Sequence, residues 1–331
     1  MTATTTERTT TMKAIVRGRY GLKALELQEV ERPELPADGV LVRVRASSVN
    51  AVDWYDVTGV PWVARPLTGL RGPKSRLTGT DFAGTVEAVG KNVTDLQVGD
   101  DVYGGGNGSF AEYVCIQAKV GRKPANLSFE EAAAAPVAAI TALQGLRDHG
   151  QLQPGQNVLV NGASGGVGTF AVQIAKALGA EVTAVCSTRN VEQSRLLGAD
   201  HVIDYTREDF TRSRRRYDVI LDVSGTKSWS QYRRVLNPQA TLVLVGAPKP
   251  NRFLGPLGHI LRVRLAAWRG SQKAVFFIAK LNRTDLELLR ELLESGKVTP
   301  VVEKRYDLAE VADALRHLGE GHAQGKLVIS V

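Results

Sequence analysis

The sequence predicts an α/β protein with two domains, one around a doubly wound parallel sheet and one around an antiparallel, barrel-like set of strands. The chain has 331 residues, which is long for a single hydrophobic core. From residue 12 to about 137 it consists of short β-like runs divided by Gly, Pro and Asp, a spacing typical of antiparallel barrels. From there to about 279, alanine-rich helical stretches alternate with apolar strands, as in parallel α/β sheets.

The elements follow in order along the chain. Residues 1–11 are expected to be a disordered tail, because they lack the apolar core of a secretory signal, and MKAIVR at 12–17 is the first predicted strand. The run SFEEAAAAPVAAITALQGL at 128–146 predicts helix. Two amphipathic helices, at 283–295 and 308–318, and a closing strand KLVISV complete the chain.

Composition excludes several classes of protein. Apolar residues make up 43% of the chain and charged residues 23%, as in folded soluble proteins, and no apolar run approaches the length of a membrane span. A cytoplasmic location is therefore expected. Cys115 and Cys186 cannot form a disulfide framework or a thiolate metal site, and both are expected to be core residues. The net charge of +8 leaves nucleic-acid binding open, but no recognised motif accompanies it.

The strongest local signal is the segment NVLVNGASGGVGTFAVQIAKALGAEVTAVCSTRN at 157–190. An apolar strand runs into a glycine cluster that opens a helix, and a second strand follows. A pyrophosphate can approach backbone N–H groups at a helix N-terminus only where side chains are absent. We therefore predict dinucleotide binding by the turn, which comprises Ala163, Ser164, Gly165, Gly166, Val167 and Gly168.

The end of the second strand indicates which nicotinamide cofactor is bound. An acidic residue there would bind the ribose 2′-OH of NAD, whereas this chain has Ser187, Thr188 and Arg189. Hydroxyls and a guanidinium suit a 2′-phosphate, so NADPH is the expected cofactor, although a polar loop with an incidental arginine stays open. Tyr205 is a candidate for the adenosine end, and a partly buried aromatic is its alternative.

Several motifs together resemble the medium-chain dehydrogenase/reductase superfamily, in its zinc-independent quinone oxidoreductase branch. They are ASSVNAVDWY at 46–55, GTDFAGTVEAVG at 79–90, VGDDVYG at 98–104, ASGGVG at 163–168 and GHAQGKLVIS at 321–330. The resemblance implies a GroES-like catalytic domain from both chain ends, 12–137 and 280–331, and a Rossmann NADP(H)-binding domain at 138–279.

The zinc-dependent alcohol dehydrogenases of that superfamily hold a catalytic metal with a Cys and a Gly-His-Glu segment. Here the corresponding positions are Asn50 and Gly79-Thr80-Asp81, so no metal is expected. Without a Lewis acid to ionise an alcohol, reduction of an electrophilic acceptor is the better fit. The resemblance thus implies hydride transfer from NADPH to a quinone or an α,β-unsaturated carbonyl compound.

The resemblance also carries residue roles. Asn50 is expected as an amide in the cleft, Asp53 as an orienting group and Tyr55 as the oxyanion donor or proton source, with a core aromatic as its alternative. Thr141 is expected near the nicotinamide, unless its hydroxyl bonds its own helix backbone. Lys326 is expected near the cofactor phosphates.

Further candidates come from their places in the predicted elements. Val223, Val245 and Ala247 lie where parallel strands end, the edge at which open sheets bind ligands. Trp54, Trp62 and Phe276 are candidates for an apolar acceptor pocket, with plain packing as the alternative. A tyrosine that enoyl thioester reductases of the mitochondrial type carry is replaced by Pro61, so that activity is less favoured.

Other functions stay open at this point. These are a zinc-free carbonyl or alcohol dehydrogenase and a non-catalytic NADPH-binding protein. The apolar strand KAVFFIA at 273–279 would be an aggregation hazard if its edge were left unpaired, and a homodimer through it is expected.

Overall fold

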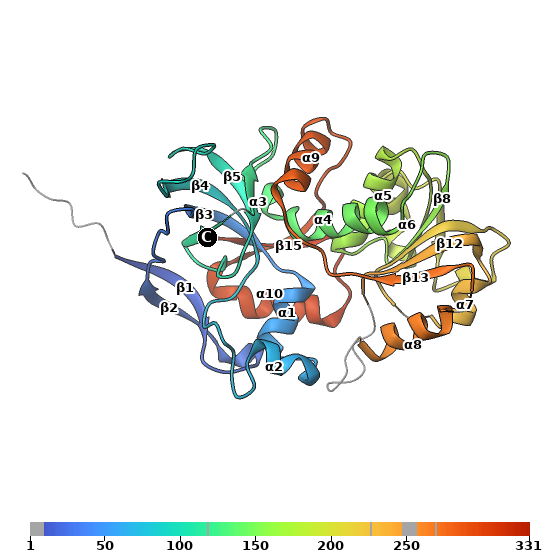
Figure 1. The fold of residues 1–331 in the computed structure, drawn as a ribbon, viewed down its shortest axis with the longest axis horizontal. Helices are drawn as coiled ribbons and strands as arrows, with labels where there is room; N and C mark the ends of the chain where they lie inside the picture. Colours follow the sequence, from blue (N-terminus) through green and yellow to red (C-terminus); the bar gives the residue numbers. More distant parts are fainter. Residues whose placement is uncertain (1–9, 118, 226, 247–256, 269) are drawn as a thin grey trace, which may run out of the picture.

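Six parallel strands form the sheet of one lobe of the molecule (Figure 1). The structure, a computed structural model, describes all residues except 1–9, 118, 226, 247–256 and 269. The spatial order of the strands is β10-β9-β8-β11-β12-β13. Successive strands are added on one side of β8 up to β10 and on its other side from β11 onward, as in doubly wound dinucleotide-binding sheets. The strands are β8 (Asn157–Asn161), β9 (Glu181–Cys186), β10 (His201–Asp204), β11 (Tyr217–Asp222), β12 (Leu236–Leu244) and β13 (Lys273–Phe276).

Helices cover both faces of this sheet, which explains why its central strands are apolar on both sides. Phe170 of α5 and Ile140 of α4 belong to the core on one face, whereas Tyr232 of α7 and Ile260 of α8 belong to the core on the other. The helices are α4 (Pro136–Gln144), α5 (Gly166–Ala177), α6 (Val191–Leu196), α7 (Trp229–Arg233) and α8 (Leu257–Ala267).

The other lobe has a seven-stranded sheet and a separate hairpin. The sheet order is β14-β15-β3-β4-β5-β7, with β6 paired to β3, and β1 pairs with β2. The strands are β1 (Thr11–Arg17), β2 (Leu25–Glu31), β3 (Val40–Ser48), β4 (Asp81–Val89), β5 (Asp101–Gly105), β6 (Tyr113–Ile116), β7 (Val120–Arg122), β14 (Val302–Asp307) and β15 (Lys326–Ser330).

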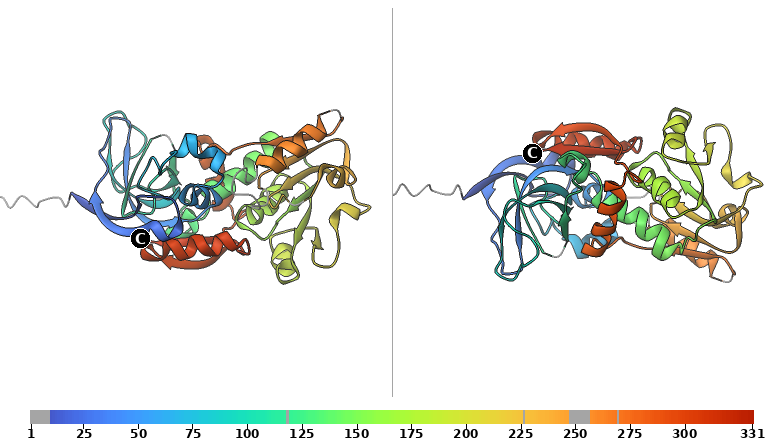
Figure 2. Two further views of the ribbon diagram at one scale, coloured as in Figure 1. Left: turned by 90° about the horizontal axis from the view of Figure 1, so that it is seen from below. Right: turned by 90° about the horizontal axis from the view of Figure 1, so that it is seen from above.

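Five helices accompany these strands, drawn from both ends of the chain (Figure 2). They are α1 (Ala51–Thr58), α2 (Arg65–Thr68), α3 (Phe129–Ala133), α9 (Arg283–Glu294) and α10 (Val311–Glu320). The antiparallel pairing of β15 with β3 aligns Val328 with Ser48. This pairing carries the last residues of the chain into the N-terminal lobe and brings Lys326 close to Asn50.

The predicted fold class is confirmed, with local corrections. The strand expected at 273–279 ends at Phe276, because Phe277 leaves the ladder and stacks on His149 with ring centroids 4.2 Å apart. The helix expected at 308–318 starts as a 3-10 turn at Leu308–Glu310 before α10. Thr11, placed in the tail, pairs with Glu31 in β1, and residues 1–9 lie outside the described part. The domain boundaries near 137 and 280 stay predictions.

Of the two cysteines, Cys186 is buried as expected, whereas Cys115 is only half-buried. Both are free thiols.

Candidate functional site

The glycine turn between β8 and α5 has the backbone clearance that a pyrophosphate needs. A Cβ at Gly168 would lie 2.1 Å from the carbonyl oxygen of Gly162, so only glycine fits there, and Gly162 has a φ of +88°. At Gly165, the residue before α5, a Cβ would meet only the Gly162 oxygen, at 3.7 Å. The first turn of α5 therefore presents open backbone N–H groups, which favour an anion.

The remaining residues of the turn have different surroundings. Ala163 is fully buried, and Ser164, Gly166 and Val167 are half-buried. The side-chain stem of Lys326 lies against Gly166, where a Cβ would come within 2.9 Å of its Cδ. The residues of this turn thus fit a dinucleotide, on the evidence of the space that its glycines leave.

The residues expected at the adenosine end lie together beyond β9. Thr188 donates a hydrogen bond to Asp204 at 2.6 Å, and Arg189 donates to the carbonyl of His322 at 2.8 Å. Ser187 is half-buried, and Tyr205 is exposed beside it, its backbone N–H donating to Cys186. The structure therefore brings all four predicted residues to the end of β9 and β10.

Two predicted residues lie at the carboxyl edge of the sheet. Val223 and Val245 follow β11 and β12 directly, and Val223 donates its N–H to the carbonyl of Asn161, at the end of β8. Ala247 lies outside the described residues. Next to it, a Cβ at Gly246 would lie 1.9 Å from the carbonyl oxygen of Val223, so the backbone is tightly packed at this edge.

A buried polar cluster lies between the two ends of the chain. Asn50 donates from its side-chain amide to Asp81 at 2.8 Å and accepts from the ammonium of Lys326 at 2.5 Å. The Lys326 nitrogen lies 3.5 Å from the Asp81 carboxylate. Asp53 accepts from the Thr80 hydroxyl at 2.6 Å and from the Asn50 backbone N–H at 2.7 Å.

This cluster adds to what is expected of Lys326, whose place near the cofactor phosphates stays a prediction. Its ammonium points to Asn50 and Asp81, not to the glycine turn, because its buried charge needs a carboxylate partner. Sequence reasoning gave Thr80 and Asp81 no positive role, although both lie in a quoted motif. The signal for Asp81 was an acidic residue opening a strand whose next residues, Phe82 and Ala83, are apolar.

Burial perturbs the acid–base behaviour of the cluster. Desolvation raises the pKa of Asp53 to about 7, with the hydrogen bond from Thr80 opposing it and the nearby Asp81 charge adding to it. Burial also raises the pKa of Asp81 and lowers that of Lys326, while their mutual attraction opposes both shifts. Each group is thus pushed toward its neutral form.

A cleft of about 610 Å³ opens beside the cluster. Asp53, Tyr55 and Thr80 line it together with Ile278, which comes from the segment after β13. Burial raises the pKa of Tyr55 and so keeps its hydroxyl protonated. The further lining residues are Arg17, Val52, Asp56, Gly59, Val60, Pro61, Thr68, Lys74, Ser75, Gly79 and Asn107.

The aromatic residues expected in the acceptor pocket lie outside this cleft. Trp54 packs toward α10, where its indole leaves no room for a side chain at Gly319. Trp62 is exposed, with the Arg65 guanidinium 5.4 Å from its ring. Phe276 packs against the core under α7 and α8. None of the three is among the residues that line this cleft, but Phe276 lines a neighbouring hollow that shares Ile278 with it. Their role in an acceptor pocket stays a prediction.

Thr141 lies on α4, and its hydroxyl donates to the Val137 carbonyl at 2.6 Å, which matches the alternative that the sequence left open. The N–H of Val137 donates to Asp81 at 3.0 Å, so the start of α4 is tied to the buried cluster.

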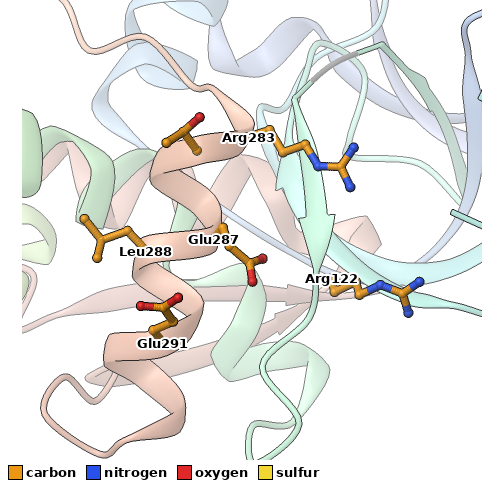
Figure 3. Close-up of a pocket in the computed structure, with 6 residues that line it drawn as sticks. Arg122, Arg283, Glu287, Leu288 and Glu291 are labelled. Atoms are coloured by element: carbon orange, nitrogen blue, oxygen red, sulfur yellow. The ribbon is translucent and has the colours of Figure 1, made fainter. Parts of the chain in front are cut away.

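A second hollow, between α9 and β7, is shown in Figure 3. Its labelled side chains do not converge on one point: Leu288 lies on one side of α9, and the Arg283 guanidinium extends on the other. Arg283 pairs with Asp95, and Glu287 pairs with Arg290. This arrangement is that of a solvated, charge-paired surface.

The residues at the positions where zinc-dependent alcohol dehydrogenases hold their catalytic metal do not fit zinc. Among the described residues, no group of three or more His, Cys, Asp or Glu side chains is placed to hold a metal ion. The ammonium of Lys326 lies beside Asp81 and Asn50, and a cation at that point would repel a second one.

Comparisons with known proteins support the same family as the motifs. A family model described as an alcohol dehydrogenase GroES-like domain matches residues 36–125, and one described as a zinc-binding dehydrogenase matches residues 197–329. The mouse protein named NAD(P)H oxidoreductase RTN4IP1, mitochondrial, is 34% identical, over 99% of this chain and 91% of its own length.

Two further relatives have names that describe reductases. The tomato 2-methylene-furan-3-one reductase is 34% identical, over 96% of this chain and 79% of its own. The solved structure of a quinone oxidoreductase from Coxiella burnetii has a TM-score of 0.86 and is 31% identical, over 97% of this chain and 99% of its own.

Proposed function

Because this chain belongs to the medium-chain dehydrogenase/reductase superfamily, in its quinone oxidoreductase branch, we propose that it reduces a quinone or an α,β-unsaturated carbonyl compound with NADPH. The observation that supports this most is the cleft lined by Tyr55 and Asp53. Asp53 accepts a hydrogen bond from Asn50, Asn50 accepts one from Lys326, and the stem of Lys326 lies against Gly166 of the glycine turn that fits a dinucleotide. NADPH would supply the hydride, and the protein has to orient the acceptor and stabilise the oxygen that becomes negative.

The glycine turn and Arg189 are proposed to hold the cofactor. The backbone N–H groups at the start of α5 would bind the pyrophosphate, and the exposed guanidinium of Arg189 would bind a 2′-phosphate. The relatives' names leave NADPH and NADH undistinguished, so the preference for NADPH depends on Ser187, Thr188 and Arg189.

Tyr55 is proposed as the hydrogen-bond donor to the acceptor oxygen. It lines the cleft, and its raised pKa keeps the proton on the hydroxyl, as a donor to a developing oxyanion requires. Asp53 and Thr80 are proposed to position this wall of the cleft through their 2.6 Å hydrogen bond.

We further propose that the reaction needs no metal. The hydrogen-bonded Asn50–Lys326–Asp81 cluster supports this, because it neutralises the carboxylate internally.

A homodimer is the remaining structural proposal. Strand β13 is at one edge of the six-stranded sheet, and among the described strands it pairs with β12 alone, so its other edge is a candidate for pairing with a second copy. Sedimentation equilibrium at micromolar concentration tests it, and a monomer would contradict it. A cytoplasmic location stays a prediction of the sequence.

The experiment for the activity is oxidation of NADPH and NADH, followed by absorbance with excess chelator present, against quinones, enones, enals and simple ketones. Turnover that prefers NADPH, requires a conjugated acceptor and survives the chelator is expected. Product analysis of one enone distinguishes conjugate reduction, which yields the saturated ketone, from carbonyl reduction, which yields the allylic alcohol. Binding of NADPH without turnover of any acceptor would contradict the proposal.

A further inference from the structure

An exposed apolar stripe runs along α8 and the residue after it. Its four apolar residues, which are named at the end of this paragraph, recur at spacings of four, four and three along the chain, so they share one helix face. The opposite face is buried, with Ile260 and Val263 in the core on the sheet. The described part of the chain therefore leaves the stripe largely uncovered. Its members, called the α8 stripe below, are Leu257, Leu261, Leu265 and Trp268, with 41%, 60%, 63% and 80% of their surface exposed.

The surroundings of the α8 stripe are strongly basic. Arg262 and Arg264 are exposed on the same helix, and α8 contains no Asp or Glu. Between Asp222 and Asp285 the sequence has no acidic residue at all, but eleven lysines and arginines. Much of the net charge of +8 is thus concentrated in the part of the chain that contains the stripe.

The same combination recurs near the mouth of the cleft. Trp62, Val63 and Leu70 are large apolar residues with 47%, 44% and 71% of their surface exposed. They belong to a second segment without acidic residues, 57–80, which contains four lysines and arginines. The guanidinium of Arg65 lies 5.4 Å from the Trp62 ring.

The two basic, apolar regions lie on the same side of the molecule. Helices α2 and α8 both lie along the lower edge of Figure 1, and both can be seen from below in Figure 2. The cleft is lined by Pro61 and Thr68 from the segment 57–80 and by Ile278, which follows β13, from the segment between Asp222 and Asp285. Ile278 is itself 78% exposed. Both segments without acidic residues therefore contribute to the lining of the cleft.

We propose that this side of the protein binds the surface of an anionic lipid bilayer, with the α8 stripe entering the headgroup region. An interfacial helix has an apolar face of Leu and Trp flanked by Lys and Arg, and its affinity combines apolar burial with attraction to anionic lipids. Among the described residues no helix is long and apolar enough to span a membrane, so the association is with the surface.

The charge distribution favours a bilayer over a second copy of the chain as the occupant. A two-fold contact through the α8 stripe would bring Arg262 and Arg264 of each copy toward those of the other. Neither of the two segments without acidic residues offers a carboxylate to pair with these arginines, and like charges brought together are destabilising. Anionic headgroups supply the missing negative charge.

The bilayer would lie at the mouth of the cleft, so an acceptor dissolved in the lipid could enter without crossing water. This consequence rests on the proposed function, whereas the binding itself does not. The two are tested by separate measurements.

The test is sedimentation of the purified full-length protein with vesicles of phosphatidylcholine alone and of phosphatidylcholine mixed with phosphatidylglycerol. The wild type is expected to bind the anionic vesicles and to be released by salt. A variant with Leu261→Ser, Leu265→Ser and Trp268→Ser, and separately an Arg262→Glu, Arg264→Glu variant, are expected to bind at least about tenfold more weakly.

Matched controls come from the opposite edge of the parallel sheet. Leu196→Ser changes a leucine that is 80% exposed on α6, and Arg195→Glu with Arg214→Glu reverses two exposed charges in the same lobe. These variants are expected to bind like the wild type. NADPH binding and melting temperature, unchanged in all variants, would show that folding is intact.

A second readout locates the contact. Brominated lipids are expected to quench the tryptophan emission of bound protein, and Trp268→Phe to remove part of that quenching, whereas Trp229→Phe leaves it. Absence of wild-type binding to anionic vesicles, or full binding by the α8 variants, overturns the proposal. Loss of a dimer in the stripe variant, with vesicle binding unchanged, would also overturn it and identify a second copy as the occupant.

Discussion

Replacement of Asp53 by asparagine is predicted to change how the stability of the protein depends on pH. Burial raises the pKa of Asp53 from 3.8 to about 7, so in the folded state the carboxyl keeps its proton where the unfolded chain has lost it. A raised pKa of an acid contributes stability that is full below the unfolded pKa and is lost as the pH rises through the folded pKa. This stability is therefore lost between about pH 4 and pH 7.

The size of the effect follows from the pKa difference. Each pH unit between the unfolded and folded pKa values costs about 1.4 kcal/mol, so between pH 5 and 8 the wild type is expected to lose about 3 kcal/mol through this group. The amide introduced by Asp53→Asn cannot ionise. Its oxygen can accept from the Asn50 N–H, and its NH2 can donate to the Thr80 hydroxyl, which then acts as the acceptor. The free energy of unfolding of the wild type minus that of Asp53→Asn should thus fall by about 3 kcal/mol.

The assay is guanidinium unfolding of both proteins at several pH values from 5 to 8. Asp200→Asn is the control: burial opposes ionisation of Asp200, but the Lys176 ammonium at 2.9 Å and the Val182 N–H at 2.7 Å lower its pKa below 3.8. The stability that ionised Asp200 contributes is lost only as the pH falls below that range. The difference in free energy of unfolding between the wild type and Asp200→Asn should therefore stay constant from pH 5 to 8. Parallel pH curves for wild type and Asp53→Asn would refute the reasoning.

Three further predictions concern the cofactor and the cleft. Gly168→Ala is expected to weaken NADPH binding and to destabilise the fold by about 1–3 kcal/mol, since its Cβ would overlap the Gly162 backbone. Fluorescence titration and thermal melting measure the two effects, and Gly18→Ala, whose Cβ would have no atom within 4 Å, is the control. Arg189→Glu should raise the Kd for NADPH by about 10- to 100-fold and leave that for NADH nearly unchanged, and equal effects on both would contradict a 2′-phosphate site. Tyr55→Phe should lower kcat by about 10- to 100-fold at unchanged NADPH affinity. Tyr306→Phe removes a hydroxyl that bonds His317 and should leave kcat unchanged. An unchanged kcat in Tyr55→Phe would exclude Tyr55 as the donor.

Much of the fold could be predicted because its signals are local. The strand, glycine turn and helix at 157–177 follow from neighbouring residues alone: apolar residues fill a strand buried on both faces, and Gly168 is required within its own turn. The amphipathic helix α9 was likewise predicted to within one residue of its observed end.

Sequence reasoning is weakest where the direction of a side chain decides whether it lines the cleft. Trp54 and Tyr55 are adjacent in sequence, but on α1 the first packs toward α10 and the second lines the cleft. Ile278, which no motif singled out, lines the cleft in the place expected for Phe276, because the strand ends at Phe276 and the chain turns after it.

By itself the sequence determined the parallel nucleotide-binding sheet, the glycine turn and the absence of cysteine and histidine at the positions where related dehydrogenases bind zinc. Only the tertiary structure decided that Asn50, Asp81 and Lys326 meet, since the pairing of β15 with β3 joins residues from opposite ends of the chain. It also decided the acid–base state of Asp53, because a pKa near 7 arises from burial, and burial is a property of the folded chain as a whole.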